Sequence, residues 1–560
     1  MVSSVAVGRK PQSRRRAWRF TGASLFCLLA ALCALPVAAQ PESIERIRTA
    51  RLPVFPETTA TPLPWPMHLA NSLHHTTRES VIRREILFRD GTPLDSLRLA
   101  ESERLLRRRA LFESVRVDTS PTDSGRVVTI RTQDLWTLSL ILSYEKEADL
   151  TEAIVGIKES NFLGTGNEVH WVQLISTDQD GVQAGLALPR LGVGRASANL
   201  SYSDLSDVRS HAILLGRYPE TPFDRWCWSL SQLGARGKQR FFVHGDEAGA
   251  CRFEQESFSA SIGRYTGRQL QTGLGIGWME RRLKPRGEPV SYVDALPPPP
   301  AFEARQHSGP LLHAAVMKRH FCELTNLDRY GVVEDLPVGW STQITIGPNL
   351  RDEEDPERAF ATQGTLAFAA FPLPRVCTSF EATGAAFFRH DRTLGERVLR
   401  GRGTIAWQPN SLVLSIAQVS ARTGADQPPT SVGYLGAETG LRGFPSREFE
   451  VRDYLLATLE QRVWSGVEIL WTGIGGNLFV NAALPSHAAL GEAERWRTGI
   501  GLGLLLGLRK RLQPPLRFEI AWRTDRPDDP TLTVSMQTSL PVIPAILWPS
   551  PTFRFAETAQ

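Results

Sequence analysis

Arg442 lies in the stretch TGLRGFPSREFE, residues 439–450, which shows neither helical nor strand periodicity. Arg442 follows a leucine and precedes the glycine and phenylalanine of an LRGF motif. A guanidinium stays charged at physiological pH and presents five N–H donors, so its chemistry is ion pairing, above all with carboxylates. If the fold removes Arg442 from water, a partner must therefore neutralise its charge.

Catalytic and metal-binding patterns are weaker. The sequence contains neither a serine nucleophile elbow nor a His-Glu-x-x-His zinc motif. His68, His74 and His75 lie close to Glu79 and suggest a metal ligand set, but a histidine cluster at the edge of a solvated helix is the more common arrangement. We therefore predict no catalytic residue, no metal site and no cofactor.

Charged and apolar residues alternate in segments that read as β-strands with two different faces. In LRFEIAWRT, residues 516–524, the even positions from Leu516 to Trp522 are apolar, whereas Arg517, Glu519 and Arg523 occupy odd positions. Glu460 and Arg462 likewise share one face of DYLLATLEQRVW. Because successive strand residues point to opposite sides, one face suits an apolar environment and the other suits water.

Such segments recur at spacings of roughly 20 to 30 residues, separated by stretches rich in Gly, Pro and Asp, which indicates an all-β protein with long loops. A soluble sandwich or propeller would pack the apolar faces together, whereas a transmembrane barrel points them at lipid. Charges in the middle of strands favour the barrel, and fourteen tryptophans agree with aromatic girdles. No apolar run after the N-terminal leader is long enough for a membrane helix.

The N-terminus is typical of a secretory signal peptide, predicted to end before Gln40. Residues 1–39 carry six basic residues, no acidic residue and one apolar run. Subtracting these six charges from the net charge of +5 leaves −1, so there is no electrostatic case for nucleic acid. Four cysteines remain after the signal peptide: Cys227, Cys251, Cys322 and Cys377. They enter an oxidising compartment, where the sequence is compatible either with a Cys227–Cys251 disulfide or with unpaired thiols.

Residues 42–134 follow a different pattern, predicted in the order strand, helix, helix, strand, strand. ESIERIRTARLPVF supplies the first strand, and TTRE, Thr76 to Glu79, has the spacing of a capping box. Asp95 is the predicted N-cap of the next helix. Two alternating segments around the turn PTDSG complete a small α+β module.

The segment VIRREILFRDGTPLDSLRLAESERLLRRRALFESVRV, residues 81–117, resembles a POTRA domain, the module that precedes outer-membrane barrels related to BamA and TamA. NFLGTG, with Asn161, Gly164 and Gly166, resembles the tight periplasmic turn near the start of those barrels. LRGF, from Leu441 through Arg442 and Gly443 to Phe444, matches the family's motif on a loop that folds into the lumen.

The resemblance implies a partner for Arg442, because in the family this arginine reaches an acidic residue on the inner barrel wall. Where relatives carry an aspartate, this chain has Asn481, a neutral acceptor. We expect Glu519 to take the pairing, with Glu460 and Glu468 as the alternatives, since the strand around Glu519 alternates so regularly.

The resemblance also implies the architecture: a signal peptide at 1–39, a POTRA-like periplasmic domain at 40–134, a barrel of about 16 antiparallel strands at 135–540, and a proline-rich tail at 541–560. Its first strand is expected near residues 138–144 and its last near 531–540.

The implied function is assistance with the insertion, assembly or translocation of other proteins at the bacterial outer membrane. The partners would be unfolded outer-membrane or secreted clients, the lipid bilayer and periplasmic accessory proteins. A passive porin-like barrel and a dedicated two-partner secretion transporter are the alternatives. A single POTRA module, Asn481 and the tail give the passive barrel some weight.

Overall fold

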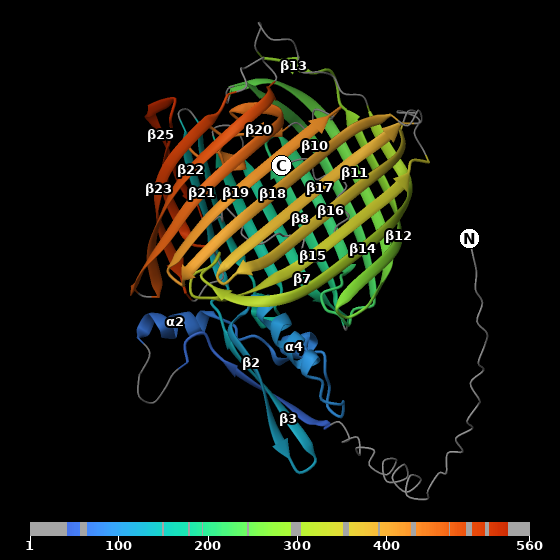
Figure 1. Cartoon of the computed structure of the whole chain (residues 1–560), viewed down its shortest axis with the longest axis vertical. Coiled ribbons are helices and arrows are strands. Elements are labelled where there is room, and N and C mark those ends of the chain that lie inside the picture. The colour runs from blue at the N-terminus through green and yellow to red at the C-terminus, as the bar shows by residue number, and fades with distance from the viewer. Residues whose placement is uncertain are drawn as a thin grey trace, which may run out of the picture.

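A large β-barrel and a smaller domain at one of its rims make up the described chain (Figure 1). The computed structural model describes residues 42–56, 64–147, 150–176, 180–192, 194–243, 246–292, 304–350, 358–389, 393–426, 433–469, 471–488, 495–509 and 514–535. The signal peptide predicted at 1–39 and the tail predicted at 541–560 lie outside these ranges. Among the described helices, none has the length and apolar character needed to cross a membrane.

The barrel is a closed antiparallel sheet in which strands consecutive in sequence are neighbours. Its first strands are short: β4 (Leu138–Glu147), β5 (Leu150–Glu159), β6 (Glu168–Ser176), β7 (Gly181–Leu191), β8 (Ala196–Leu205) and β9 (Val208–Arg217). Longer strands follow: β10 (Trp226–Val243), β11 (Asp246–Thr266), β12 (Leu270–Pro285), β14 (Arg305–Thr325), β15 (Val333–Pro348), β16 (Arg358–Leu373), β17 (Val376–Arg389), β18 (Leu394–Asn410) and β19 (Val413–Ala425).

The circle is completed by β21 (Phe449–Ile469), β22 (Thr472–Ala488), β23 (Arg497–Leu508), β24 (Leu516–Arg523) and β25 (Arg526–Ser535), which pairs with β4. Two short strands, β13 (Val290–Ser291) and β20 (Gly433–Leu435), add to the sheet. Apart from these two, the described residues form twenty barrel strands. The expected number of 16 was therefore wrong, because six strands already lie between Leu138 and Arg217, more closely spaced than the roughly 20 to 30 residues that the sequence pattern indicated.

The two faces of the barrel wall differ as the alternation predicted. Along β24, Arg517 and Glu519 are 3% and 5% exposed, whereas Phe518 between them is 37% exposed. Large apolar side chains at least 60% exposed lie on the outer face of other strands, among them Leu274, Leu312, Leu459 and Leu478. The barrel therefore directs charge inward and apolar surface outward.

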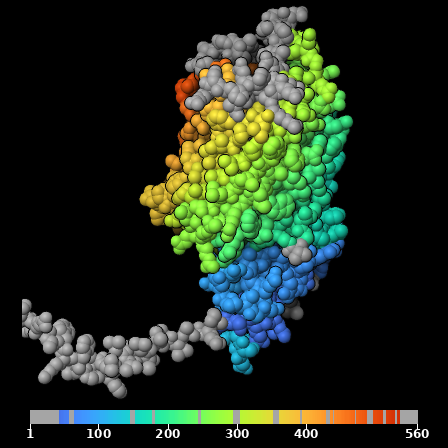
Figure 2. All heavy atoms as spheres, turned by 90° about the vertical axis from the view of Figure 1, so that its right-hand side faces the viewer, coloured from blue at the N-terminus to red at the C-terminus, as the bar shows by residue number. Residues whose placement is uncertain are grey.

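The smaller domain contains β1 (Ile44–Leu52), α2 (Trp65–Leu73), α3 (Glu79–Glu85), α4 (Ser96–Arg108), β2 (Phe112–Thr122) and β3 (Gly125–Asp134). β3 is the central strand, parallel to β1 and antiparallel to β2. Ile82 of α3 and Leu106 of α4 pack on Ile44, Val128 and Ile130 of the sheet. Figure 2 shows this domain, in blue, directly against the lower rim of the barrel.

The observed helix boundaries in this domain agree only in part with those predicted from the sequence. The predicted N-cap is confirmed, because Asp95 accepts hydrogen bonds from the backbone N–H groups of Leu97 and Arg98 at 3.0 and 3.3 Å. The predicted capping box is wrong: α3 begins at Glu79 without a side-chain cap, and Thr77 instead donates to Asp134 at 3.0 Å. α2 was not anticipated, because prolines around its first turn obscure the helical pattern.

The four cysteines of the barrel are free thiols in this structure. Along the β10–β11 hairpin, Cys227 lies opposite Gly263 and Cys251 opposite Gln239. The two cysteines therefore sit at different heights of the same hairpin, which excludes the bridge between them that the sequence left open.

Candidate functional site

The LRGF segment lies inside the barrel, between the short helix η3 (Ala437–Thr439) and β21. Leu441 and Phe444 are fully buried and pack with Phe449 and Leu456 of β21. Gly443 has φ +92°, and a Cβ there would stand 3.0 Å from the backbone carbon of Trp522. A glycine is therefore required both by the backbone conformation and by the close approach to β24.

Arg442 pairs with two glutamates of the inner wall. Its Nη2 lies 2.9 Å from Oε2 of Glu460, and its Nη1 donates to Oε1 of Glu519 at 3.1 Å. The guanidinium carbon stands 3.4 Å from the ring centroid of Phe479, a cation–π arrangement. The loop arginine thus contacts residues of three wall strands, β21, β22 and β24.

Further residues pair with the two glutamates of this cluster. Arg517 lies 2.9 Å from Glu460 and 2.6 Å from Glu519, and Arg462 lies 2.6 Å from Glu460. Asn477 donates to Glu519 at 2.6 Å. The fixed geometry of these contacts suits bracing of the wall, because buried charges are tolerated when they are paired and hydrogen-bonded.

The predicted partners of Arg442 divide into two groups. Glu519 and Glu460 both contact its guanidinium. Asn481 does not accept from the guanidinium but donates through Nδ2 to the Arg442 carbonyl at 3.4 Å, so it holds the loop backbone. Glu468 lies elsewhere, where it accepts from Tyr330 at 3.1 Å and pairs with Arg509 at 3.4 Å.

The sequence reasoning missed the glycines that make room for this cluster. Along β23 the residues Gly499, Gly501 and Gly503 alternate with the exposed apolar residues and therefore face inward. A Cβ on Gly503 would stand 2.5 Å from Oδ1 of Asn477 and 2.8 Å from Cγ of Glu519. The signal was present in GIGLG, where glycine alternates with apolar residues at strand spacing.

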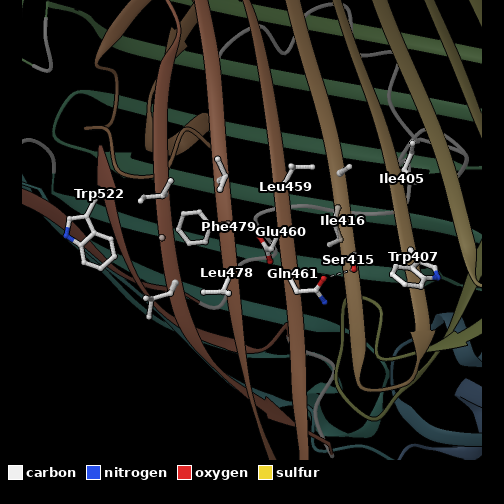
Figure 3. Close-up of a pocket in the computed structure, with 15 residues that line it drawn as sticks. Ile405, Trp407, Ser415, Ile416, Leu459, Glu460, Gln461, Leu478, Phe479 and Trp522 are labelled. Carbon is white, nitrogen blue, oxygen red and sulfur yellow. Dashed lines mark hydrogen bonds between the residues drawn. The ribbon is translucent and has the colours of Figure 1, made fainter. Parts of the chain in front are cut away.

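The opposite side of the same wall is apolar. Figure 3 shows Leu459, Gln461 and Leu478 around a cavity of about 650 Å³ that spans β18 to β24. Glu460 falls between two of these residues in sequence, so its side chain takes the inner face. The dashed bond in Figure 3, 2.6 Å from Ser415 Oγ to Gln461 Oε1, satisfies a polar pair on the outer side.

A second cluster of charges joins the small domain to the barrel rim. Glu85 of α3 is fully buried and pairs with Arg109, after α4, at 3.1 Å and with Arg190 of β7 at 2.6 Å. Arg107 of α4 reaches Glu323 of β14 at 2.7 Å and Asp335 of β15 at 2.8 Å. Ion pairs on both sides of the domain therefore hold it against the barrel.

Glu220, in the turn between β9 and β10, belongs to the same interface. Its carboxylate pairs with Arg190 at 2.7 Å and Arg195 at 2.9 Å, and Arg108 of α4 lies 3.7 Å away. Burial by itself raises the pKa of Glu220, but the charges of Arg190, Arg108 and Arg195 outweigh it and lower the pKa to about 2.

The turn NFLGTG lies against the small domain. Asn161 donates to Oγ1 of Thr77 at 2.9 Å and accepts from the N–H of Gly166 at 2.8 Å. Gly164 and Gly166 have φ +72° and +68°, and the carbonyl of Gly164 accepts from the N–H of Arg78 at 2.9 Å. Thr77 in turn binds Asp134, which contacts His74 at 3.0 Å. A chain of hydrogen bonds thus connects the first barrel turns to the domain.

Comparison with known proteins gives no family model and no curated protein that matches this chain. Among solved structures, it is similar to BamA from Haemophilus ducreyi lacking POTRA domains 1–3, with 13% identity over 88% of this chain and 84% of that chain and a TM-score of 0.39. It is also similar to CdiB from Escherichia coli, with 11% identity over 89% and 76% of the two chains and a TM-score of 0.44. For CdiB from Acinetobacter baumannii the identity is 10% over 88% and 73%, with a TM-score of 0.41. The fold stated above rests on the strand pairing of this chain itself.

Proposed function

We propose that this chain is an outer-membrane β-barrel protein that assists the insertion, assembly or translocation of other proteins. The small domain acts as a POTRA-like periplasmic module that captures extended clients, and the barrel handles them. The observation that carries this proposal is the docking of the domain on the barrel rim through the buried ion pairs of Glu85 with Arg190 and of Arg107 with Asp335. Such contacts couple a client-binding module to the barrel wall, which a passive pore does not need.

The surface of the barrel supports its place in a membrane. In a closed sheet the backbone groups of each strand pair with its neighbours, which is what a lipid environment demands. The outer face carries large exposed apolar side chains, including Leu274 at 71% and Leu312 at 66% exposure, while Glu460 and Arg517 point inward. This distribution is typical of outer-membrane barrels.

The sheet of the small domain supports client capture. β2 is an edge strand of the three-stranded sheet, because β3 occupies the centre. Figure 1 shows the β2–β3 hairpin extending away from the barrel. An exposed edge can pair with an extended client by β-augmentation, which satisfies the client backbone before it reaches lipid.

The closing strands support handling at the wall. Within the described residues, β25 pairs with β4 at four positions, from Leu532 to Ser535, compared with eight positions between β23 and β24. In the proposed mechanism this junction is where the wall opens. Arg442, bound to the wall at Glu460 and Glu519, would brace the barrel during such opening.

The test is the folding of a urea-denatured porin into liposomes that contain this protein. We expect faster folding than in empty liposomes, and the gain should disappear when residues 40–134 are deleted. A Glu79→Ala variant, altered only at an exposed pair of the domain, should behave like the wild type. If the correctly folded barrel gives no acceleration, the proposal is wrong, and a passive channel or a dedicated secretion transporter replaces it.

A further inference from the structure

Helix α2 exposes a ridge of large apolar side chains. Trp65, Leu69 and Leu73 recur every fourth residue and are 76%, 49% and 62% exposed. Because residues four apart lie one above the other on a helix, the three side chains form a continuous stripe. A stripe of this size on one short helix indicates a surface that another phase or molecule covers.

The other face of α2 is tied to the barrel. Asn71 donates to the carbonyl of Phe55 at 2.7 Å and accepts from its N–H at 3.1 Å. The Phe55 ring in turn lies 5.2 Å, centroid to centroid, from Trp471 in the turn between β21 and β22. Directly after the helix, His74 contacts the buried carboxylate of Asp134 at 3.0 Å. These contacts fix both the position and the rotation of the helix.

Helix α2 lies at the level of the lower rim of the barrel. Figure 1 shows it lying across the barrel axis, just below the ends of the last strands. Next to the Trp471 turn, Val467 and Ile469 of β21 are 54% and 57% exposed, so the apolar outer face of the barrel continues down to this turn. The exposed ridge of α2 therefore lies close to the lower border of the barrel's apolar belt.

We propose that α2 is an interfacial helix whose Trp65, Leu69 and Leu73 insert into the phospholipids of the periplasmic leaflet around the barrel. The inference rests on the proposed function only for the place of the barrel in a membrane. It adds a third attachment of the domain, beside the ion pairs of Glu85 and Arg107, and holds the domain at a set angle to the bilayer.

The composition of the segment fits a phospholipid surface. Residues 58–78 contain no acidic side chain, and α2 itself contains no Asp, Glu, Lys or Arg. Nothing in this segment therefore repels anionic headgroups. Tryptophan prefers the membrane interface, and nine residues are too few to span a bilayer, so the helix lies in the interface plane.

The test uses the full chain in liposomes of phosphatidylethanolamine and phosphatidylglycerol with a phospholipid that carries a diazirine on its acyl chain. After irradiation and trypsin digestion, lipid adducts are quantified by mass spectrometry. Trypsin releases α2 within residues 52–78, the outer face of β23 within 498–509, and the β2–β3 turn within 117–126. The last two peptides are internal positive and negative controls.

We expect several-fold more adducts on 52–78 than on 117–126, located at residues 65–73. The triple variant Trp65→Ser, Leu69→Ser, Leu73→Ser should reduce labelling of 52–78 to the level of 117–126 and leave 498–509 unchanged. Ser72→Asn, on the exposed side of the same helix but off the apolar ridge, should label like the wild type. If the triple variant does not fold, Leu69→Ser alone should still lower the adducts on 52–78.

Two outcomes overturn the inference and separate it from the proposed function. If 498–509 is labelled but 52–78 is not, the barrel is in lipid and α2 faces water, so a protein partner or a second copy must cover the ridge. If neither peptide is labelled, the membrane placement of the barrel fails together with the inference.

Discussion

Arg442 lies 2.9 Å from Glu460, a glutamate whose side chain is fully buried on the inner face of β21. The same guanidinium is 3.1 Å from Glu519 on β24, so one loop residue connects strands that are not neighbours in the sheet. The loop is thus attached to the wall by charge as well as by the buried Leu441 and Phe444.

Replacing Arg442 with alanine should destabilise the barrel. Two buried carboxylates would lose a shared partner, and removing one member of a buried pair costs about 3 to 5 kcal/mol. The measurement is the temperature at which the detergent-solubilised barrel loses its heat-modifiable mobility on gels. Arg509→Ala is the matched control, because the pair of Arg509 with Glu468 is largely exposed and should contribute about 0 to 1 kcal/mol. An unchanged temperature for Arg442→Ala would show that the loop does not brace the wall.

Gly503→Ala should also destabilise the barrel. The added Cβ would meet the Phe518 carbonyl oxygen at 2.8 Å as well as the side chains of Asn477 and Glu519, and overpacking costs about 1 to 3 kcal/mol. Gly403→Ala on β18 is the control, because a Cβ there has no neighbour within 4 Å. The fraction of each variant that folds into detergent micelles at increasing urea concentration compares the two. Equal urea midpoints would contradict the role assigned to the glycine stripe.

Glu85→Ala should release the small domain from the barrel rim. The change leaves Arg109 and Arg190 buried without their common carboxylate. We expect faster hydrogen exchange in α4 and faster proteolysis of the connection at residues 135–137. Glu79→Ala is the control on the same helix, because Glu79 is 43% exposed and pairs with the equally exposed Arg83 at 2.7 Å. If the two variants exchange alike, the ion pairs do not hold the domain.

The contact at Glu220 should weaken in acid. Its pKa is lowered from 4.5 to about 2 by the surrounding arginines, so the folded state binds its proton less tightly than the unfolded chain does. The stabilisation is therefore complete above about pH 4.5 and is lost as the pH falls towards 2. Thermal unfolding between pH 6 and pH 3 should show a smaller loss of stability in Glu220→Gln than in the wild type. Identical pH profiles would contradict this assignment.

The sequence by itself determined which face of each strand carries charge. The alternation of apolar and charged residues along 516–523 is visible without knowledge of the neighbouring strands. The burial of Arg517 and Glu519 has the same period of two. The N-cap at Asp95 was equally local, because the cap and its donors lie within three residues. The need of Arg442 for an acidic partner also followed from its chemistry alone.

Only the tertiary structure decided which acid that partner is. Glu460 and Glu519 meet Arg442 because the register of β21 to β24 brings residues of different strands to one height, whereas Glu468 lies at the rim. The number of strands could not be obtained from residue spacing, because the lengths of the hairpins vary along the chain. The contact of Asn481 with the loop backbone depended on how the loop folds. The contacts of Arg442 with Asn481 and Glu519 join residues 39 and 77 positions apart, and long-range pairing of this kind is set by sheet closure rather than by local pattern.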